Sequence, residues 1–171
     1  MIFVTVGTQL PFDRLIEGID QWAEANPKME VFVQSGKSSC KPQNCNWRQF
    51  ISQASFDYFL EKADVIVAHA GVGSILSALE YCKPIIVLPR RLEFQEHRND
   101  HQLATAERFC TLDSVHVAWE IEELPSLLDD VKAGQRNRFD QPSTSGPLIR
   151  RVREFVTRQP TTTDENVKGL S

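Results

Sequence analysis

The fold of this chain is decided by the stretch Asp64-Val65-Ile66-Val67-Ala68-His69-Ala70-Gly71-Val72-Gly73-Ser74. Residues 65–68 are a short apolar run typical of a buried strand, and residues 75–81 follow with a helical pattern. The two glycines between them permit a tight turn and a close approach of a ligand to the backbone. Because the first N–H groups of a helix have no intrahelical partner and carry partial positive charge, this stretch predicts an anion-binding turn.

Other interpretations of the same turn are open at this stage. The glycines could serve only tight packing between strand and helix, and Ser74 could cap the helix or donate its hydroxyl to the ligand. A dinucleotide fingerprint is disfavoured, because Leu76 stands where Gly71-x-Gly73 would need a third small residue. A dinucleotide-dependent oxidoreductase is therefore the poorest match.

The composition is that of one soluble domain. The chain has 171 residues, of which 41% are hydrophobic and 25% charged, and its net charge is −4. This balance provides no basic field for nucleic acid, and we expect no nucleic-acid partner. The sequence has no run of 18 apolar residues, and a strand pattern over residues 2–6 replaces a basic leader, so we expect a cytoplasmic protein. The spacing of Cys40 and Cys45 is not that of a zinc pair, and we expect neither a metal site nor a cofactor.

Apolar runs and helical patterns alternate along the chain. The expected strands are residues 2–6, 29–33, 48–52, 65–68, 85–88 and 115–118. The expected helices are residues 11–25, 56–63, 74–82, 100–109, 121–131 and 147–158. The alternation predicts an α/β fold, a single Rossmann-like domain with a mostly parallel sheet over residues 1–158, followed by a disordered tail at 159–171.

Four loops would share the ligand-binding edge of such a sheet. They are residues 7–9, 34–36, 69–74 and 89–102, each of which follows an expected strand. Ligands of parallel α/β sheets bind outside the carboxyl ends of the strands. We therefore expect one site built from these loops.

Four motifs in order carry a family resemblance. They are residues 4–8 (VTVGT), residues 63–74 (ADVIVAHAGVGS), residues 83–89 (KPIIVLP) and residues 101–104 (HQLA). Over residues 1–130 the chain resembles the donor-binding C-terminal half of family 28 glycosyltransferases. By length it is similar to the small soluble subunits of two-chain enzymes, either the PssE-like subunit of bacterial exopolysaccharide synthesis or the catalytic subunit of the eukaryotic dolichol-linked N-acetylglucosaminyltransferase. The resemblance implies the fold of the C-terminal half of a GT-B glycosyltransferase.

The resemblance also implies roles for single residues. The turn after the central strand would face the donor diphosphate, residues 7–8 would line the cleft, residues 34–36 would lie near the base, and residues 101–102 would contact the sugar hydroxyls. The implied donor-binding residues are Gly7, Thr8, Gln34, Ser35, Gly36, Ala70, Gly71, Val72, Gly73, Ser74, Ser77, Glu80, His101 and Gln102. One departure concerns the glutamate that usually grips the ribose, because Ser77 stands at its position. Glu80, three residues later on the same helix face, could replace it or be an exposed surface charge.

The implied function is that of a donor-binding and catalytic subunit. It would transfer a sugar from a UDP-sugar to a lipid-linked acceptor with inversion, in exopolysaccharide or cell-surface glycan synthesis. Because a GT-B enzyme needs two such domains, we expect a membrane-anchored partner subunit to bind the acceptor and to hold this chain at the inner face of the membrane. The alternative is a non-catalytic nucleotide-sugar-binding or regulatory module.

The residues supply few groups for catalysis. His69 is the candidate general base, although a histidine at the end of a buried strand is more often structural. His97 and His101 are weaker candidates. Arg90, Arg91 and Arg98 could contact an acidic donor sugar or a lipid phosphate. The sequence has no Asp-x-Asp motif, which predicts transfer without a metal ion, and the basic helix expected at 147–158 could face an anionic membrane.

Overall fold

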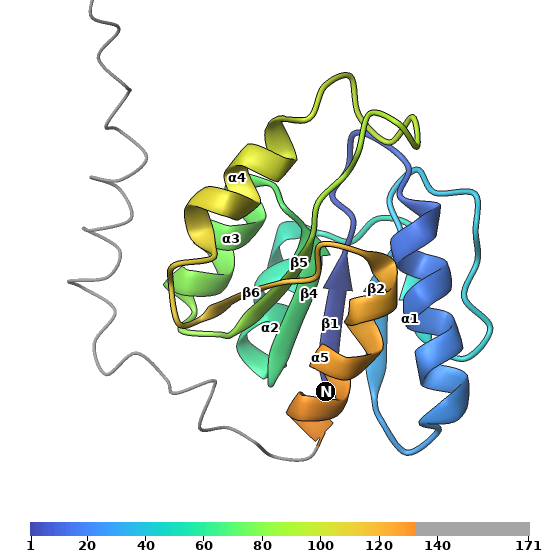
Figure 1. Ribbon diagram of the computed structural model, residues 1–171. Coiled ribbons are helices and arrows are strands. Elements are labelled where there is room, and N and C mark those ends of the chain that lie inside the picture. Colours follow the sequence, from blue (N-terminus) through green and yellow to red (C-terminus); the bar gives the residue numbers. More distant parts are fainter. Residues whose placement is uncertain (133–171) are drawn as a thin grey trace, which may run out of the picture.

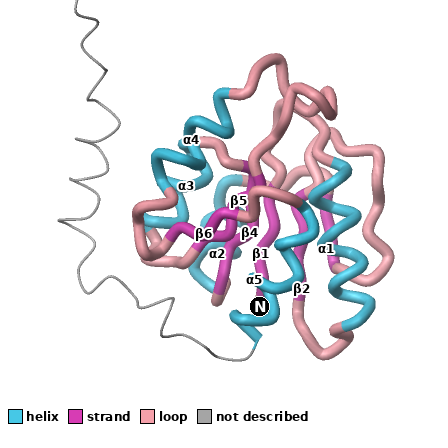
Figure 2. Tube along the Cα trace, in the orientation of Figure 1, coloured by secondary structure: helices cyan, strands magenta, loops and turns pink. Residues whose placement is uncertain are grey.

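A computed structural model describes residues 1–132, and six parallel strands form one sheet in that part of the chain (Figures 1 and 2). The strands are β1 (Ile2–Thr5), β2 (Val31–Gln34), β3 (Asn46–Arg48), β4 (Val65–His69), β5 (Ile85–Leu88) and β6 (Val115–Val117). Their order is β3-β2-β1-β4-β5-β6, and every neighbouring pair is parallel. The direction of winding changes between β1 and β4, so a crevice is expected at their carboxyl ends. The expected α/β fold with a parallel sheet is confirmed.

Helices cover both faces of the sheet, as Figure 1 shows. They are α1 (Asp13–Ala25), α2 (Gln53–Lys62), α3 (Val72–Glu80), α4 (His101–Phe109), the 3-10 helix η1 (Ile121–Glu123) and α5 (Leu124–Lys132). Helices α1 and α5 pack on the face that Ile2 and Val4 of β1 present. Helices α2, α3 and α4 pack on the opposite face with Phe3. Because both faces are buried, β5 is apolar throughout and β1 is apolar up to its last residue, Thr5, in place of an alternating pattern.

Two expected elements lie elsewhere than the sequence indicated. The strand expected at 48–52 is β3, three residues at the sheet edge that pair with β2 through Asn46, Trp47 and Arg48. The apolar pair that suggested the later position follows the strand, and Phe50 is half exposed. Expected strand 29–33 begins only at Val31, because the preceding residues form the turn after α1.

The helix after the glycine turn begins earlier than expected. Helix α3 starts at Val72, with Gly71 at the N-cap and no side chain capping it. Ser74 is therefore inside the first turn and does not cap the helix. The other interpretation of this residue, donation of its hydroxyl to a ligand, stays a prediction.

Part of the sequence-based expectation falls outside the described residues. This applies to the basic helix at 147–158, the tail at 159–171 and the domain limit at residue 158. Within residues 1–132, the helices are all too short or too polar to cross a bilayer.

Candidate functional site

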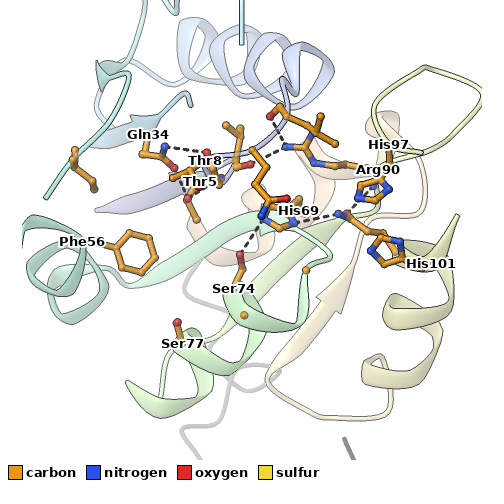
Figure 3. A pocket seen from close by; sticks show the side chains of 18 of the residues that line it. Thr5, Thr8, Gln34, Phe56, His69, Ser74, Ser77, Arg90, His97 and His101 are labelled. Carbon is orange, nitrogen blue, oxygen red and sulfur yellow. Dashed lines mark hydrogen bonds between the residues drawn. The ribbon is translucent and has the colours of Figure 1, made fainter. Parts of the chain in front are cut away.

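A pocket of about 490 Å³ lies at the carboxyl ends of β1 and β4, where the winding of the sheet changes direction (Figure 3). Its walls come from five segments: the end of β1 with its loop, the end of β2, the start of α2, the β4–α3 turn, and the loop between β5 and α4 with the start of α4. The lining residues are Thr5, Val6, Gly7, Thr8, Gln9, Leu10, Gln34, Ile51, Gln53, Phe56, His69, Gly71, Gly73, Ser74, Ser77, Arg90, His97, His101 and Gln102. The four loops expected at this edge therefore do meet in one place.

The amino end of α3 is open to this pocket. Gly73 is exposed, and a Cβ built on it would meet no atom within 4 Å. Ser74 and Ser77 line the pocket from the next positions of the same helix. Backbone N–H groups that no side chain caps, with space in front of them, form the arrangement that binds a phosphate.

The other two glycines of the pocket, Gly7 and Gly71, leave room for the ring of His69. A Cβ at Gly71 would lie far inside contact distance of the ring carbon Cε1 and the ring nitrogen Nδ1. A Cβ at Gly7 would lie 2.9 Å from Nε2 of the same ring, and Gly7 also has a left-handed backbone with φ +75°. Of the three pocket glycines, Gly73 is thus the one whose missing side chain leaves open space in the pocket.

His69 is a neutral, hydrogen-bonded side chain at pH 7. Burial, and then the charges of Arg90, His97 and His101, together lower its pKa to about 4. Its Nε2 lies 3.3 Å from Oγ of Ser74, and its Nδ1 lies 3.3 Å from Nε2 of Gln102. Both ring nitrogens are engaged within the protein, so the geometry favours the structural interpretation of His69 over that of a general base.

Gln102 and the two other histidines form the wall opposite α3. Gln102 is 3% exposed, and its amide is used by His69 and by the backbone N–H of Arg90. His97 and His101 lie with their ring centroids 4.3 Å apart, and Nδ1 of His101 contacts Oδ1 of Asn99. Burial lowers the pKa of His97, and His101 lowers it further. The expected contact of residues 101–102 with a sugar stays a prediction.

Gln34 braces the pocket floor. The hydroxyl of Thr5 donates to Oε1 of Gln34 over 2.6 Å, and Nε2 of Gln34 donates to the carbonyls of Gly7 and Gln49, each over 3.1 Å. Gln34 is 3% exposed yet reaches the pocket lining. The amide thus joins the loops after β1 and β3, and all of its strong hydrogen-bonding groups are occupied.

Several expected site residues lie outside the pocket lining. Ser35 is 2% exposed, and Gly36 is buried against the carbonyl of Gly7 in a left-handed conformation with φ +56°. Glu80 is exposed at the last residue of α3, a turn beyond Ser77, and is not part of the pocket lining, so its role toward a ribose stays a prediction. Two more residues that the structure leaves outside are Ala70 and Val72.

Arg90 proves to be a buried brace. Its guanidinium donates to the carbonyls of Val6 (2.7 Å), Leu10 (3.0 Å) and Glu96 (3.2 Å) and contacts that of Pro11. Burial lowers its pKa to about 10, and the Glu96 carboxylate opposes that shift, so the group is charged at pH 7. Because these donors are occupied by backbone, the structure gives no support to an Arg90 contact with an acidic sugar.

Arg91 is likewise engaged within the protein, so the structure gives no support to its contact with an acidic sugar. Its guanidinium pairs with Glu93 and with Glu120, whose carboxylates raise its pKa, and it donates to the carbonyl of Trp119. The contacts of Arg91 with Trp119 and Glu120 connect the β5–α4 loop to the segment after β6.

One wall of the pocket is apolar, and sequence reasoning did not identify it. Ile51 and Phe56 line the pocket beside Gln53, at the start of α2. The Phe56 ring packs edge-on against Phe3 at 5.5 Å between centroids, whereas the sequence pattern placed this residue only in an expected helix. A side chain that shares its surface between core and cavity carries the same periodic signal as a buried one.

The comparisons with known proteins agree with the fold. The family model of the glycosyltransferase family 28 C-terminal domain matches residues 1–156. The chain is 31% identical over 117 residues to the human UDP-N-acetylglucosamine transferase subunit ALG13. The matched region covers 63% of this chain and 10% of that protein. The chain therefore spans a small part of this relative's length.

Two solved structures share the architecture. The solution structure of ALG13 covers 88% of this chain and 93% of that one, with a TM-score of 0.60 and 20% identity. The glycotransferase of kitacinnamycin covers 91% of this chain and 38% of that one, with a TM-score of 0.60 and 22% identity. The fold is that of one half of a GT-B glycosyltransferase, as expected. With the family model matching nearly the whole sequence, the chain belongs to the glycosyltransferase family 28 C-terminal domain family.

Proposed function

We propose that this chain binds a UDP-sugar and is the donor-binding, catalytic subunit of a two-chain inverting glycosyltransferase. The observation that carries the proposal is the uncapped amino end of α3, open to the pocket at the switch point of the sheet. Negative charge builds on the diphosphate as it leaves the sugar. The dipole of α3 stabilises that charge by about 1–2 kcal/mol, and oriented N–H donors in a dry cleft add to this.

The shape of the pocket suggests how a UDP-sugar lies in it. The diphosphate meets Gly73 and Ser74, and the base packs on the apolar wall of Ile51 and Phe56, where aromatic and aliphatic surface is available. The sugar then faces the third side of the pocket, formed by His97 and His101. This orientation follows from matching each ligand part to the wall of like chemistry.

Relatives support the identity of the donor and the need for a partner. A related human protein is named as a subunit of a UDP-N-acetylglucosamine transferase, which favours N-acetylglucosamine as the sugar. The engagement of Arg90 with backbone carbonyls takes away the support that this residue would give to a uronic acid. We further propose that a membrane-anchored partner presents a lipid-linked acceptor and holds this chain at the cytoplasmic face of the membrane.

A titration with UDP tests the proposal most directly. Wild-type protein is expected to bind UDP in isothermal calorimetry, and Gly73→Ala is expected to weaken binding about tenfold or more, because the new methyl group stands where the phosphate must approach. The free energy of unfolding of the variant is expected to lie within about 1 kcal/mol of the wild-type value, since alanine suits a helix at least as well as glycine.

The matched control is Glu80→Ala, at the exposed far end of the same helix. It is expected to leave UDP affinity unchanged. Absence of UDP binding by the wild type would refute the nucleotide site. Loss of UDP affinity in Glu80→Ala would instead support the expectation that this glutamate binds the ribose.

Transfer is expected to be insensitive to metal removal. Within residues 1–132 no three His, Cys, Asp or Glu side chains are grouped as metal ligands, and the helix dipole supplies the charge stabilisation in this proposal. Transfer from UDP-N-acetylglucosamine by the chain and its partner is expected to keep its rate in EDTA. Loss of activity that Mg²⁺ or Mn²⁺ restores would contradict this prediction.

A non-catalytic nucleotide-sugar-binding module is the second candidate. It is favoured by one observation, the low pKa and full engagement of His69, which leave the pocket without a clear general base. The two candidates differ in the assembled enzyme. A catalytic subunit loses transfer in Gly73→Ala even at saturating UDP-sugar, whereas in a regulatory module the rate at saturation is unchanged.

A further inference from the structure

Four polar groups form one continuous chain along the pocket wall (Figure 3). The backbone N–H of Arg90 donates to Oε1 of Gln102 over 3.1 Å. Nε2 of Gln102 lies 3.3 Å from Nδ1 of His69, and Nε2 of His69 lies 3.3 Å from Oγ of Ser74. The chain runs from the start of the β5–α4 loop to the first turn of α3.

The direction of every hydrogen bond in this row of four groups follows from the first group, the backbone N–H of Arg90. A backbone N–H can only donate, so the atom of Gln102 that faces Arg90 is the carbonyl oxygen. The other end of the same amide is then the NH₂ group, which can only donate, and Nδ1 of His69 has to accept. A neutral imidazole that accepts at Nδ1 carries its proton at Nε2, so it donates to Oγ of Ser74.

We propose that Gln102 is a positioning residue that holds His69 in the tautomer protonated at Nε2, and that the Ser74 hydroxyl hydrogen is thereby left to donate to a phosphate in the pocket. The second half of this statement rests on the proposed function, and the first half does not. An oxygen that already accepts from the imidazole turns its own hydrogen elsewhere, and Ser74 lines the pocket.

The surroundings hold this arrangement in place. Gln102 is 3% exposed, so its amide cannot turn to solvent without losing both partners. The charged and titratable groups that act on His69 are Arg90, His97 and His101, and all of them disfavour its protonation. A doubly protonated ring would present a donor to the Gln102 NH₂ group, and the hydrogen bond between them would be lost.

The first test reads the tautomer on the full-length protein without any ligand. In ¹⁵N-edited NMR spectra of the histidine rings, His69 is expected to show a protonated Nε2 and an unprotonated Nδ1 at neutral pH. In Gln102→Glu the carboxylate accepts at both ends, so the tautomer is expected to reverse and the His69 pKa to rise. A wild-type spectrum with the proton at Nδ1 would overturn the proposal, whatever the variant does.

The second test couples the tautomer to phosphate binding, with UDP as the probe. In wild-type protein, Ser74→Ala is expected to reduce UDP affinity about tenfold through the lost charge-assisted hydrogen bond. In the Gln102→Glu background, where Ser74 now donates to the imidazole, the same substitution is expected to cost less than about twofold. Equal losses in both backgrounds would show that Gln102 does not act through Ser74.

Gln21→Glu on the exposed side of α1 is the matched control for the added charge. It is expected to change neither the His69 spectrum nor the effect of Ser74→Ala. If wild-type protein fails to bind UDP, the proposed function falls, and the tautomer measurement still decides the role of Gln102 within the fold.

Discussion

Replacing Arg90 with methionine is expected to lower the free energy of unfolding by about 3–5 kcal/mol, the range for removing one partner of a buried charged hydrogen-bond network. The Arg90 guanidinium satisfies backbone carbonyls of the loop after β1 and of the loop after β5, and it packs 4.6 Å from the ring centroid of Phe12. Methionine keeps much of the apolar contact and supplies no donor. The carbonyls would be left buried without partners, each at a cost of about 1–3 kcal/mol before relaxation.

Urea unfolding monitored by circular dichroism measures this change. Arg90→Lys, which keeps the charge and part of the donor set, is expected to lie between wild type and Arg90→Met. Arg98→Met in the same loop is the matched control, because Arg98 is exposed, and a surface substitution of this kind changes stability by less than about 0.5 kcal/mol. An Arg90→Met protein as stable as wild type would show that the carbonyls find other donors.

Wild-type protein is expected to lose about 3 kcal/mol of stability between pH 6.5 and pH 4 through His69 alone. The unfolded chain takes up the imidazole proton near pH 6.5, whereas the folded protein takes it up near pH 4, where burial and then Arg90, His97 and His101 have moved the pKa. Stability is therefore complete above about pH 6.5, falls as the pH is lowered, and has lost this contribution below about pH 4.

The comparison that isolates this effect is with His69→Gln. Other groups titrate in both proteins, so the difference between their unfolding free energies is expected to shrink by about 3 kcal/mol as the pH falls through this range. An NMR titration of the His69 ring gives the folded pKa independently. A difference that is constant with pH would mean that the folded protein protonates His69 as easily as the unfolded chain does.

The fold was predictable because its signal is local. Continuous apolar runs such as residues 85–88 mark strands that are covered on both faces, and glycine turns mark their ends. The exception is instructive: β3 is three residues long, and its sequence Asn46-Trp47-Arg48 has no apolar pattern of its own. It is a strand because β2 offers an edge to pair with, which is a property of the neighbour.

The candidate site was predictable in position and only partly in roles. The glycine turn and the neighbouring loops converge as expected, since parallel strands end at one edge of the sheet. The hydrogen bonds by which Arg90 and Gln34 connect the pocket loops could not be predicted, because a polar side chain shows this role only once backbone carbonyls surround it. Those carbonyls come from loops up to 84 residues away in sequence, and no local pattern reports them.

The fit between Gly71 and the ring of His69 makes the two positions dependent on each other over evolutionary time. A Cβ at position 71 would overlap the imidazole where the ring now lies, whereas a smaller residue at position 69 removes that overlap. A lineage that changes both must therefore give up the imidazole first and fill position 71 afterwards. Descendants with alanine or serine at the second position and histidine still at the first are expected to be absent from any functional set of sequences.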